Sequence, residues 1–174
     1  GGAVSIHVKF APQPEDLACA RIVDGSATLL LAADLVVAAE TSTRAKIGHG
    51  NTQVLLNTNA VPTLAQRLDP DHTFDTAPLL RALEQAAGVA AVSRIDASDI
   101  ALRLMGDTIY CNMLMLGHAW QLGHVPLSLA ALQRAIEING NAVEANLRAF
   151  LVGRMSACRP DALAPSTHGD ERPQ

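Results

Sequence analysis

The chain has 174 residues, of which 49% are apolar and 17% are charged, and its formal net charge is −4. A chain of this length and apolar content can bury a core of its own, which excludes an intrinsically disordered segment. The negative charge argues against a nucleic-acid-binding protein, because phosphate binding needs a basic surface. The longest apolar run, residues 29–39, is interrupted by Asp34 and is too short to span a bilayer.

The cysteines indicate the compartment. Cys19, Cys111 and Cys158 lie far apart and are odd in number, which is typical of a reducing cytoplasm and not of a disulfide framework. Their spacing matches no cluster-binding motif, so we expect no iron–sulfur centre within this chain. The sequence therefore predicts a cytoplasmic protein.

The first predicted element is a strand over residues 4–10. Val4, Ile6, Val8 and Phe10 alternate with polar residues, which is the pattern of a strand with one buried face. We expect His7 and Lys9 on the opposite face, toward solvent or an interface. Pro12 and Pro14 end the strand, and residues 15–24 form a connector.

The middle of the chain alternates between predicted strands and helices. Continuous apolar runs of strand length predict strands covered on both faces, over residues 35–39, 53–59 and 89–95. Capping residues and glycine stops predict helices over residues 27–32, 41–48, 75–88 and 96–105. Pro62 marks a turn, and residues 68–75 form a polar surface loop. This alternation predicts an α/β fold with three layers, built on a mainly parallel, Rossmann-like sheet.

Residues 106–154 contain three amphipathic patterns that predict three closing helices, a helical C-terminal part of the fold. The apolar faces that define them are Ile109, Met113, Leu116 or Gly117, and Trp120; then Leu129, Leu132 and Ile136; then Val143, Leu147, Phe150 and Leu151. Gly123 and Asn139-Gly140 end the first two helices. Asn141 is the expected cap of the third, with Glu144 three residues later, close to a capping box.

The same stretch carries a family resemblance. GDTIYCNMLMLGHAWQLGHVPLS (residues 106–128) and AIEINGNAVEANLRAFLVGR (residues 135–154) resemble the gamma subunit or gamma domain of the 2-oxoacid:ferredoxin oxidoreductases. The likeness is to the indolepyruvate type, especially its long fused bacterial form. GGAVSIHVKF at the start and DLVVAAE and VLLNTNAVPT in the middle are similar to that family too. The resemblance covers roughly residues 1–155.

The resemblance implies an enzyme that decarboxylates a 2-oxoacid to an acyl-coenzyme A and passes electrons to ferredoxin. Thiamine diphosphate, iron–sulfur clusters and coenzyme A would be held elsewhere in the parent, so this piece would be inactive alone. We expect a gamma-type domain at residues 1–157 and a polar tail at 158–174. The family's glycine-rich turn, first helix and second strand have no counterpart here. An open sheet edge could then pair with a second copy, so a homodimer is possible.

The residues suggest few sites. In doubly wound sheets ligands bind at the carboxyl ends of strands, where Ala39-Glu40 and Asn57-Thr58-Asn59 are expected. Asn57 and Thr58, together with Asn112 from the resemblance, are the candidates for coenzyme A contact or a domain interface. Ordinary turn chemistry is the alternative for the Asn-Thr-Asn run.

Other kinds of site find little support. We expect no catalytic residue and no metal site, and no phosphate-binding glycine loop is present. Cys111 fits an apolar core better than a metal site. Trp120 suits either a domain interface or the core.

Two further hypotheses belong to other functional classes. The chain could be a non-catalytic α/β module used only for assembly with other domains or subunits. It could be a free-standing nucleotide-binding protein, which the absent glycine loop argues against. Composition does not distinguish indolepyruvate from other oxoacids.

Overall fold

The computed structural model describes residues 4–17, 21–58 and 75–163. Its strands are β1 (Leu29–Ala32), β2 (Gln53–Asn57) and β3 (Val92–Ile95). Its α-helices are α1 (Leu35–Ala39), α2 (Thr41–Arg44), α4 (Ala77–Ala87), α5 (Ala97–Met105), α6 (Cys111–Gln121), α7 (Leu129–Asn139) and α8 (Val143–Cys158). Short 3₁₀ helices are η1 (Pro14–Leu17), η2 (Val89–Ala91), η3 (Thr108–Tyr110) and η4 (Pro160–Leu163).

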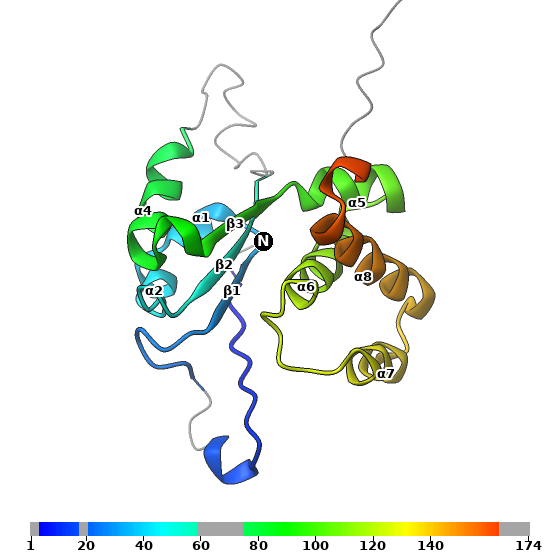
Figure 1. The fold of residues 1–174 in the computed structure, drawn as a ribbon, viewed down its shortest axis with the longest axis horizontal. Helices are drawn as coiled ribbons and strands as arrows, with labels where there is room; N and C mark the ends of the chain where they lie inside the picture. Colours follow the sequence, from blue (N-terminus) through cyan, green and yellow to red (C-terminus); the bar gives the residue numbers. More distant parts are fainter. Residues whose placement is uncertain (1–3, 18–20, 59–74, 164–174) are drawn as a thin grey trace, which may run out of the picture.

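The sheet is parallel and has the order β1-β2-β3, with Leu29 opposite Gln53 and Val54 opposite Val92. Successive side chains of β2 alternate between two cores, as the pleat requires. Val54 and Leu56 pack in a core with α1 and α4, whereas Leu55 packs in a second core with α5, α6 and α8. Helices therefore cover both faces of the sheet (Figure 1), which confirms the predicted three-layer, mainly parallel α/β fold.

Several local predictions are confirmed. Residues 53–57 form the central strand, whose last four side chains are buried. The predicted cap of α4 is off by one residue: Thr76 occupies the N-cap position, and Asp75, one residue earlier, accepts a hydrogen bond from the backbone N–H of Ala77 at 2.9 Å. Asp96 caps α5 by accepting from the N–H of Asp99, and Gly106 ends that helix in the left-handed conformation.

The prediction for residues 27–39 is wrong, because strand and helix are exchanged. Residues 29–32 form β1 instead of a helix, and residues 35–39 form α1 instead of a strand. The cause is Asp34, whose Oδ1 accepts hydrogen bonds from the N–H groups of Val36 (2.8 Å) and Val37 (3.2 Å) and so begins a helix. A five-residue apolar run fits a buried helix turn as well as a strand.

The predicted strand at residues 4–10 is also wrong. The segment is extended but pairs with no strand of the described structure, and its apolar side chains are exposed. In Figure 1 it is drawn without a strand arrow and leads away from the sheet to η1. A period-2 pattern selects side-chain faces, but a strand also needs a neighbour with which to exchange backbone hydrogen bonds.

The three closing helices are confirmed, but their buried faces agree only in part. In α7, Leu132 and Ile136 are buried as predicted. Ile109 lies exposed in η3, ahead of α6, and Leu151 is exposed on α8. Within α6 the predicted face is not distinct, because the helix is enclosed between the sheet and α8 and most of its circumference is buried.

The predicted cap of α8 is wrong as well. Ala142, not Asn141, occupies the N-cap position, in the left-handed conformation with φ 44°. The backbone carbonyl of Asn141 instead accepts a hydrogen bond from Asn146 Nδ2 at 2.9 Å. The Pro62 turn and most of the 68–75 loop lie outside the described residues.

Candidate functional site

The carboxyl edge of the sheet is built around Asn57, the last residue of β2. Its side-chain N–H₂ donates to the carbonyl of Ala33 (3.2 Å) and to Ser98 Oγ (2.9 Å). Its Oδ1 accepts from the backbone N–H groups of Ala97 (3.1 Å) and Ser98 (3.4 Å). Asn57 is buried. One amide thus joins the end of β1 and the first turn of α5 to the end of β2.

Cys111 continues this network into α6. Ser98 Oγ lies 3.8 Å from Cys111 Sγ, and both residues are buried. Burial raises the pKa of the Cys111 thiol, because a thiolate there would lose its hydration; the hydrogen bond from Ser98 opposes this shift and Asp96 adds to it. A protonated, buried thiol is a poor nucleophile, so Cys111 serves the core.

The other two predicted site residues are exposed. Thr58 follows β2 and donates its backbone N–H to the carbonyl of Ile95 at 2.9 Å, which leaves its side chain at the surface. Asn112 is exposed on the first turn of α6, next to Cys111. The contacts Asn57–Ser98 and Ser98–Cys111 link the ends that carry Thr58 and Asn112. Both side chains can donate and accept hydrogen bonds at this edge.

The expected position of Ala39-Glu40 is wrong. Ala39 ends α1, so Ala39-Glu40 follows a helix and not a strand. The residue that follows β1 closely is Asp34, whose carboxylate is engaged in capping α1. Asp34 was missed because the apolar run behind it was assigned to a strand.

Behind the edge, α6 and α8 approach so closely that two glycines are required. A Cβ built at Gly117 would lie 2.9 Å from the carbonyl carbon of Phe150, and one at Gly153 would lie 2.7 Å from that of Leu114. The obstacles are backbone atoms, which cannot rotate away. Both glycines stand in the motifs that carry the family resemblance, LG-x-AWQ and GR.

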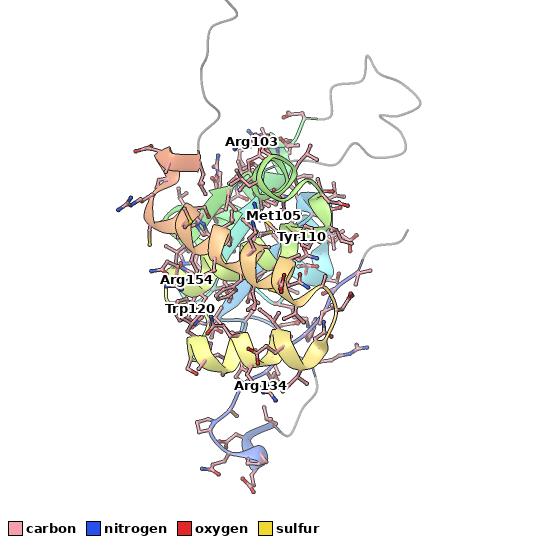
Figure 2. The ribbon with its side chains drawn as sticks, turned by 90° about the vertical axis from the view of Figure 1, so that its right-hand side faces the viewer. Arg103, Met105, Tyr110, Trp120, Arg134 and Arg154 are labelled. Atoms are coloured by element: carbon pink, nitrogen blue, oxygen red, sulfur yellow. The ribbon has the colours of Figure 1, made fainter. Side chains whose placement is uncertain are left out.

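Those two motifs also meet through Trp120. Its Nε1–H donates to the carbonyl of Leu127 at 2.8 Å, and its ring packs tilted against Phe150 with centroids 6.0 Å apart. The guanidinium carbon of Arg154 lies 4.8 Å from the Trp120 ring centroid, and Arg154 Nε donates to Gln121 Oε1 at 3.0 Å. Figure 2 shows Trp120 and Arg154 together on this side of the molecule. Spacing alone could not have paired residues on different helices.

His118 occupies the interior of the same helix pair. Its Nδ1 lies 2.7 Å from Ser156 Oγ, and Ser156 donates its hydroxyl proton to the carbonyl of Gly153 at 2.7 Å. Burial lowers the pKa of His118, and the nearby His124 lowers it further. A neutral histidine therefore links α6 to α8.

Two other features are absent from the described ranges. Residues 4–17, 21–58 and 75–163 contain no group of three or more His, Cys, Asp or Glu side chains placed to hold a metal ion. None of the helices in those ranges is both long enough and apolar enough to cross a membrane.

The chain was compared with known proteins. Residues 1–155 match the family model described as pyruvate ferredoxin/flavodoxin oxidoreductase. No curated protein sequence matches this chain. Among solved structures, the chain is similar to pyruvate oxidoreductase subunit PORC from Thermotoga maritima, with 22% identity and a TM-score of 0.46, over 73% of this chain and 61% of that one. On the family match, the chain belongs to the pyruvate ferredoxin/flavodoxin oxidoreductase family.

Proposed function

We propose that this chain is the gamma-type domain of a 2-oxoacid:ferredoxin oxidoreductase. The proposed substrate of the parent enzyme is indolepyruvate or a related aromatic oxoacid. The parent enzyme would form an acyl-coenzyme A, release CO₂ and pass electrons to ferredoxin in the cytoplasm. This domain would not be catalytic alone. Its partners would be the thiamine-binding and ferredoxin-like parts of the parent, with a second copy as a further partner.

The observation that carries this proposal is the family match over residues 1–155. The described structure supports it in one respect. The motifs that resemble the gamma type, AWQ and GR, contact each other through Trp120, Gln121 and Arg154. The substrate is inferred from the resemblance of those motifs to the indolepyruvate type.

The implied cofactors differ in how they fit these residues. An iron–sulfur cluster needs several thiolates together, whereas Cys111 is buried and Cys158 is exposed at the far end of α8. The described residues therefore do not fit a cluster. For coenzyme A, Thr58 and Asn112 offer exposed hydrogen-bonding groups at the carboxyl edge. Asn57 would act indirectly, since its amide binds the protein itself.

The first test is turnover by the full-length parent. Oxoacid-dependent reduction of a viologen dye would be measured with coenzyme A present, comparing indolepyruvate, phenylpyruvate and pyruvate. The control is the same protein without residues 1–174. We expect turnover with an aromatic oxoacid and its loss on deletion. A parent that holds its clusters and thiamine diphosphate but reduces no dye would contradict the proposal.

A second test addresses the site residues. Thr58→Ala and Asn112→Ala in the parent should raise KM for coenzyme A by about tenfold if each removes one hydrogen bond worth about 1.4 kcal/mol, with kcat little changed. Asn141→Ala is the matched control, because Asn141 is also an exposed asparagine but lies before α8. Equal effects at positions 112 and 141 would argue against a site at the carboxyl edge.

A second function keeps specific support. A non-catalytic assembly module would need an exposed apolar surface, and Val4, Ile6, Val8 and Phe10 provide one. The deletion experiment distinguishes the oxidoreductase domain from the assembly module. A parent with all cofactors in place but no oxoacid turnover would favour the assembly module.

A further inference from the structure

The outer face of α8 carries an exposed apolar stripe. The helix packs against α6 through its opposite face, where Phe150 and Gly153 are buried. Leu151 and Met155 are 45% and 51% exposed, and Cys158 is exposed as well. Their spacing of four and three residues places these side chains in one line along the helix. Figure 2 looks onto the side of the molecule that carries α8.

Arginines border this stripe on both sides. At about 100° per residue, Arg148 lies to one side of Leu151 and Arg154 to the other. Arg159 follows the last residue of the helix and is exposed. Residues 145–159 contain these three arginines and no aspartate or glutamate, in a chain whose net charge is −4. The stripe is therefore apolar with a positively charged border.

The two arginines of the helix are held in place by neutral groups. Arg148 Nη2 donates to the backbone carbonyl of Leu104 at 3.1 Å. Arg154 Nε donates to Gln121 Oε1 at 3.0 Å, and its guanidinium lies over the Trp120 ring. No ion pair between described residues involves either arginine. A neutral acceptor fixes a guanidinium without cancelling its charge, so its remaining N–H groups can bind a carboxylate with little further loss of side-chain entropy.

We infer that the outer face of α8 is a docking surface for an acidic, amphipathic polypeptide segment from another part of the parent enzyme. Apolar side chains of that segment cover Leu151 and Met155, and its carboxylates bind Arg148 and Arg154. A free phosphate would leave the apolar stripe uncovered, whereas a polypeptide covers both the stripe and its charged border. Arginine and tryptophan beside apolar surface are typical of interface hot spots. The inference deepens the partner part of the proposed function and rests on it for the existence of other enzyme parts.

Cys158 reports whether the stripe is covered. In the full-length parent at physiological salt, peptide maps give the rate at which iodoacetamide modifies Cys158. We expect this rate to be at least about tenfold lower than in the same protein unfolded in urea, the protection given by a docked state favoured by about 1.4 kcal/mol. High salt should raise the rate, because it screens charge pairs. The readout needs no oxoacid turnover, so it can fail while the proposed activity holds, and the reverse.

Arg148→Gln tests the charge. In the parent it should raise the rate of Cys158 modification severalfold, because the docked segment loses a charged contact. Ten residues of helix place Arg148 about 15 Å along the axis from Cys158, beyond the Debye length of about 8 Å, so the thiol itself is not altered. Arg134→Gln is the matched control: Arg134 is also an exposed arginine, but it lies on α7 and pairs with Glu137. It should leave the rate unchanged.

Cross-linking identifies the partner segment. Arg154→Lys keeps the charge and supplies an amine that a carbodiimide couples to a carboxylate in contact. In the parent, we expect position 154 to be joined to an Asp or Glu outside residues 1–174, and Arg134→Lys to give no such link. The inference would be overturned by a Cys158 that reacts as fast as in the unfolded protein, by equal rates in Arg148→Gln and Arg134→Gln, or by links from position 154 only to carboxylates within residues 1–174.

Discussion

A methyl group at position 117 tests how α6 and α8 are held together. Carbon atoms in contact prefer separations of about 3.5–4.0 Å. A Cβ at Gly117 would lie 2.9 Å and 3.1 Å from two backbone carbons of Phe150, closer than that range. The helices would therefore move apart by about 0.5–1 Å, which removes about a quarter to a half of the dispersion energy of each contact across the gap. Leu114 and Phe150, 0% and 1% exposed, fill this interface.

Two opposing effects set the magnitude. Overpacking costs about 1–3 kcal/mol, and the upper end applies because a backbone obstacle cannot adopt another rotamer. Alanine is better than glycine in a helix interior by about 1 kcal/mol. The steric cost is the larger, so Gly117→Ala should lower the free energy of unfolding by about 2 kcal/mol.

The assay is urea denaturation followed by circular dichroism and by the fluorescence of Trp120, which lies in this interface. Asn112→Ala is the control, because position 112 is exposed on the same helix and should change stability by less than about 0.5 kcal/mol. Combining Gly117→Ala with Gly153→Ala should cost less than the sum of the two, since the first change already opens the gap. A Gly117→Ala protein as stable as the control, or strictly additive costs, would refute the close-contact argument.

Asn57→Ala should destabilise the fold by about 2–4 kcal/mol in urea titrations, because several buried groups lose their partner together. Ala142→Gly should raise the free energy of unfolding by about 0.5–1 kcal/mol, as glycine adopts its φ of 44° without strain. Burial lowers the pKa of His118 below 6.5, so the unfolded chain binds the proton first. The free energy of unfolding should therefore be highest above pH 6.5 and decrease as the pH falls below it. The decrease should be smaller in His118→Gln, which has no imidazole to protonate. In peptide maps after iodoacetamide treatment, exposed Cys158 should be modified well before Cys111, whose pKa burial raises.

The sequence predicted elements well where a capping residue and a periodic pattern agreed. Asp96 and Gly106 mark helix boundaries that the structure reproduces, and Asp75 lies one residue before the N-cap of α4. The prediction for residues 27–39 failed because two short apolar runs flank Asp34, and composition does not distinguish a buried strand from a single helix turn. Which run became the strand was decided by pairing with β2, a contact distant in sequence.

The candidate site was predictable to a smaller extent. Asn57 was singled out by its place after a strand, but its bonds to α5 depend on the fold and cannot be read from spacing. The pairing of Trp120 with Arg154 was likewise invisible, although both belong to motifs of the resemblance. The sequence therefore identified these residues, but their contacts could be seen only in the tertiary structure.

The way polar groups are used at the carboxyl edge bears on function. The carboxylates of Asp34 and Asp96 cap helices, and the amide of Asn57 joins three segments, so these groups are occupied in holding the edge together. The exposed side chains that remain from the predicted set are Thr58 and Asn112, a hydroxyl and an amide. Such neutral groups position a ligand by hydrogen bonds but do not transfer protons near neutral pH. This edge is therefore suited to orienting a molecule whose chemistry another domain performs, as the proposed role requires.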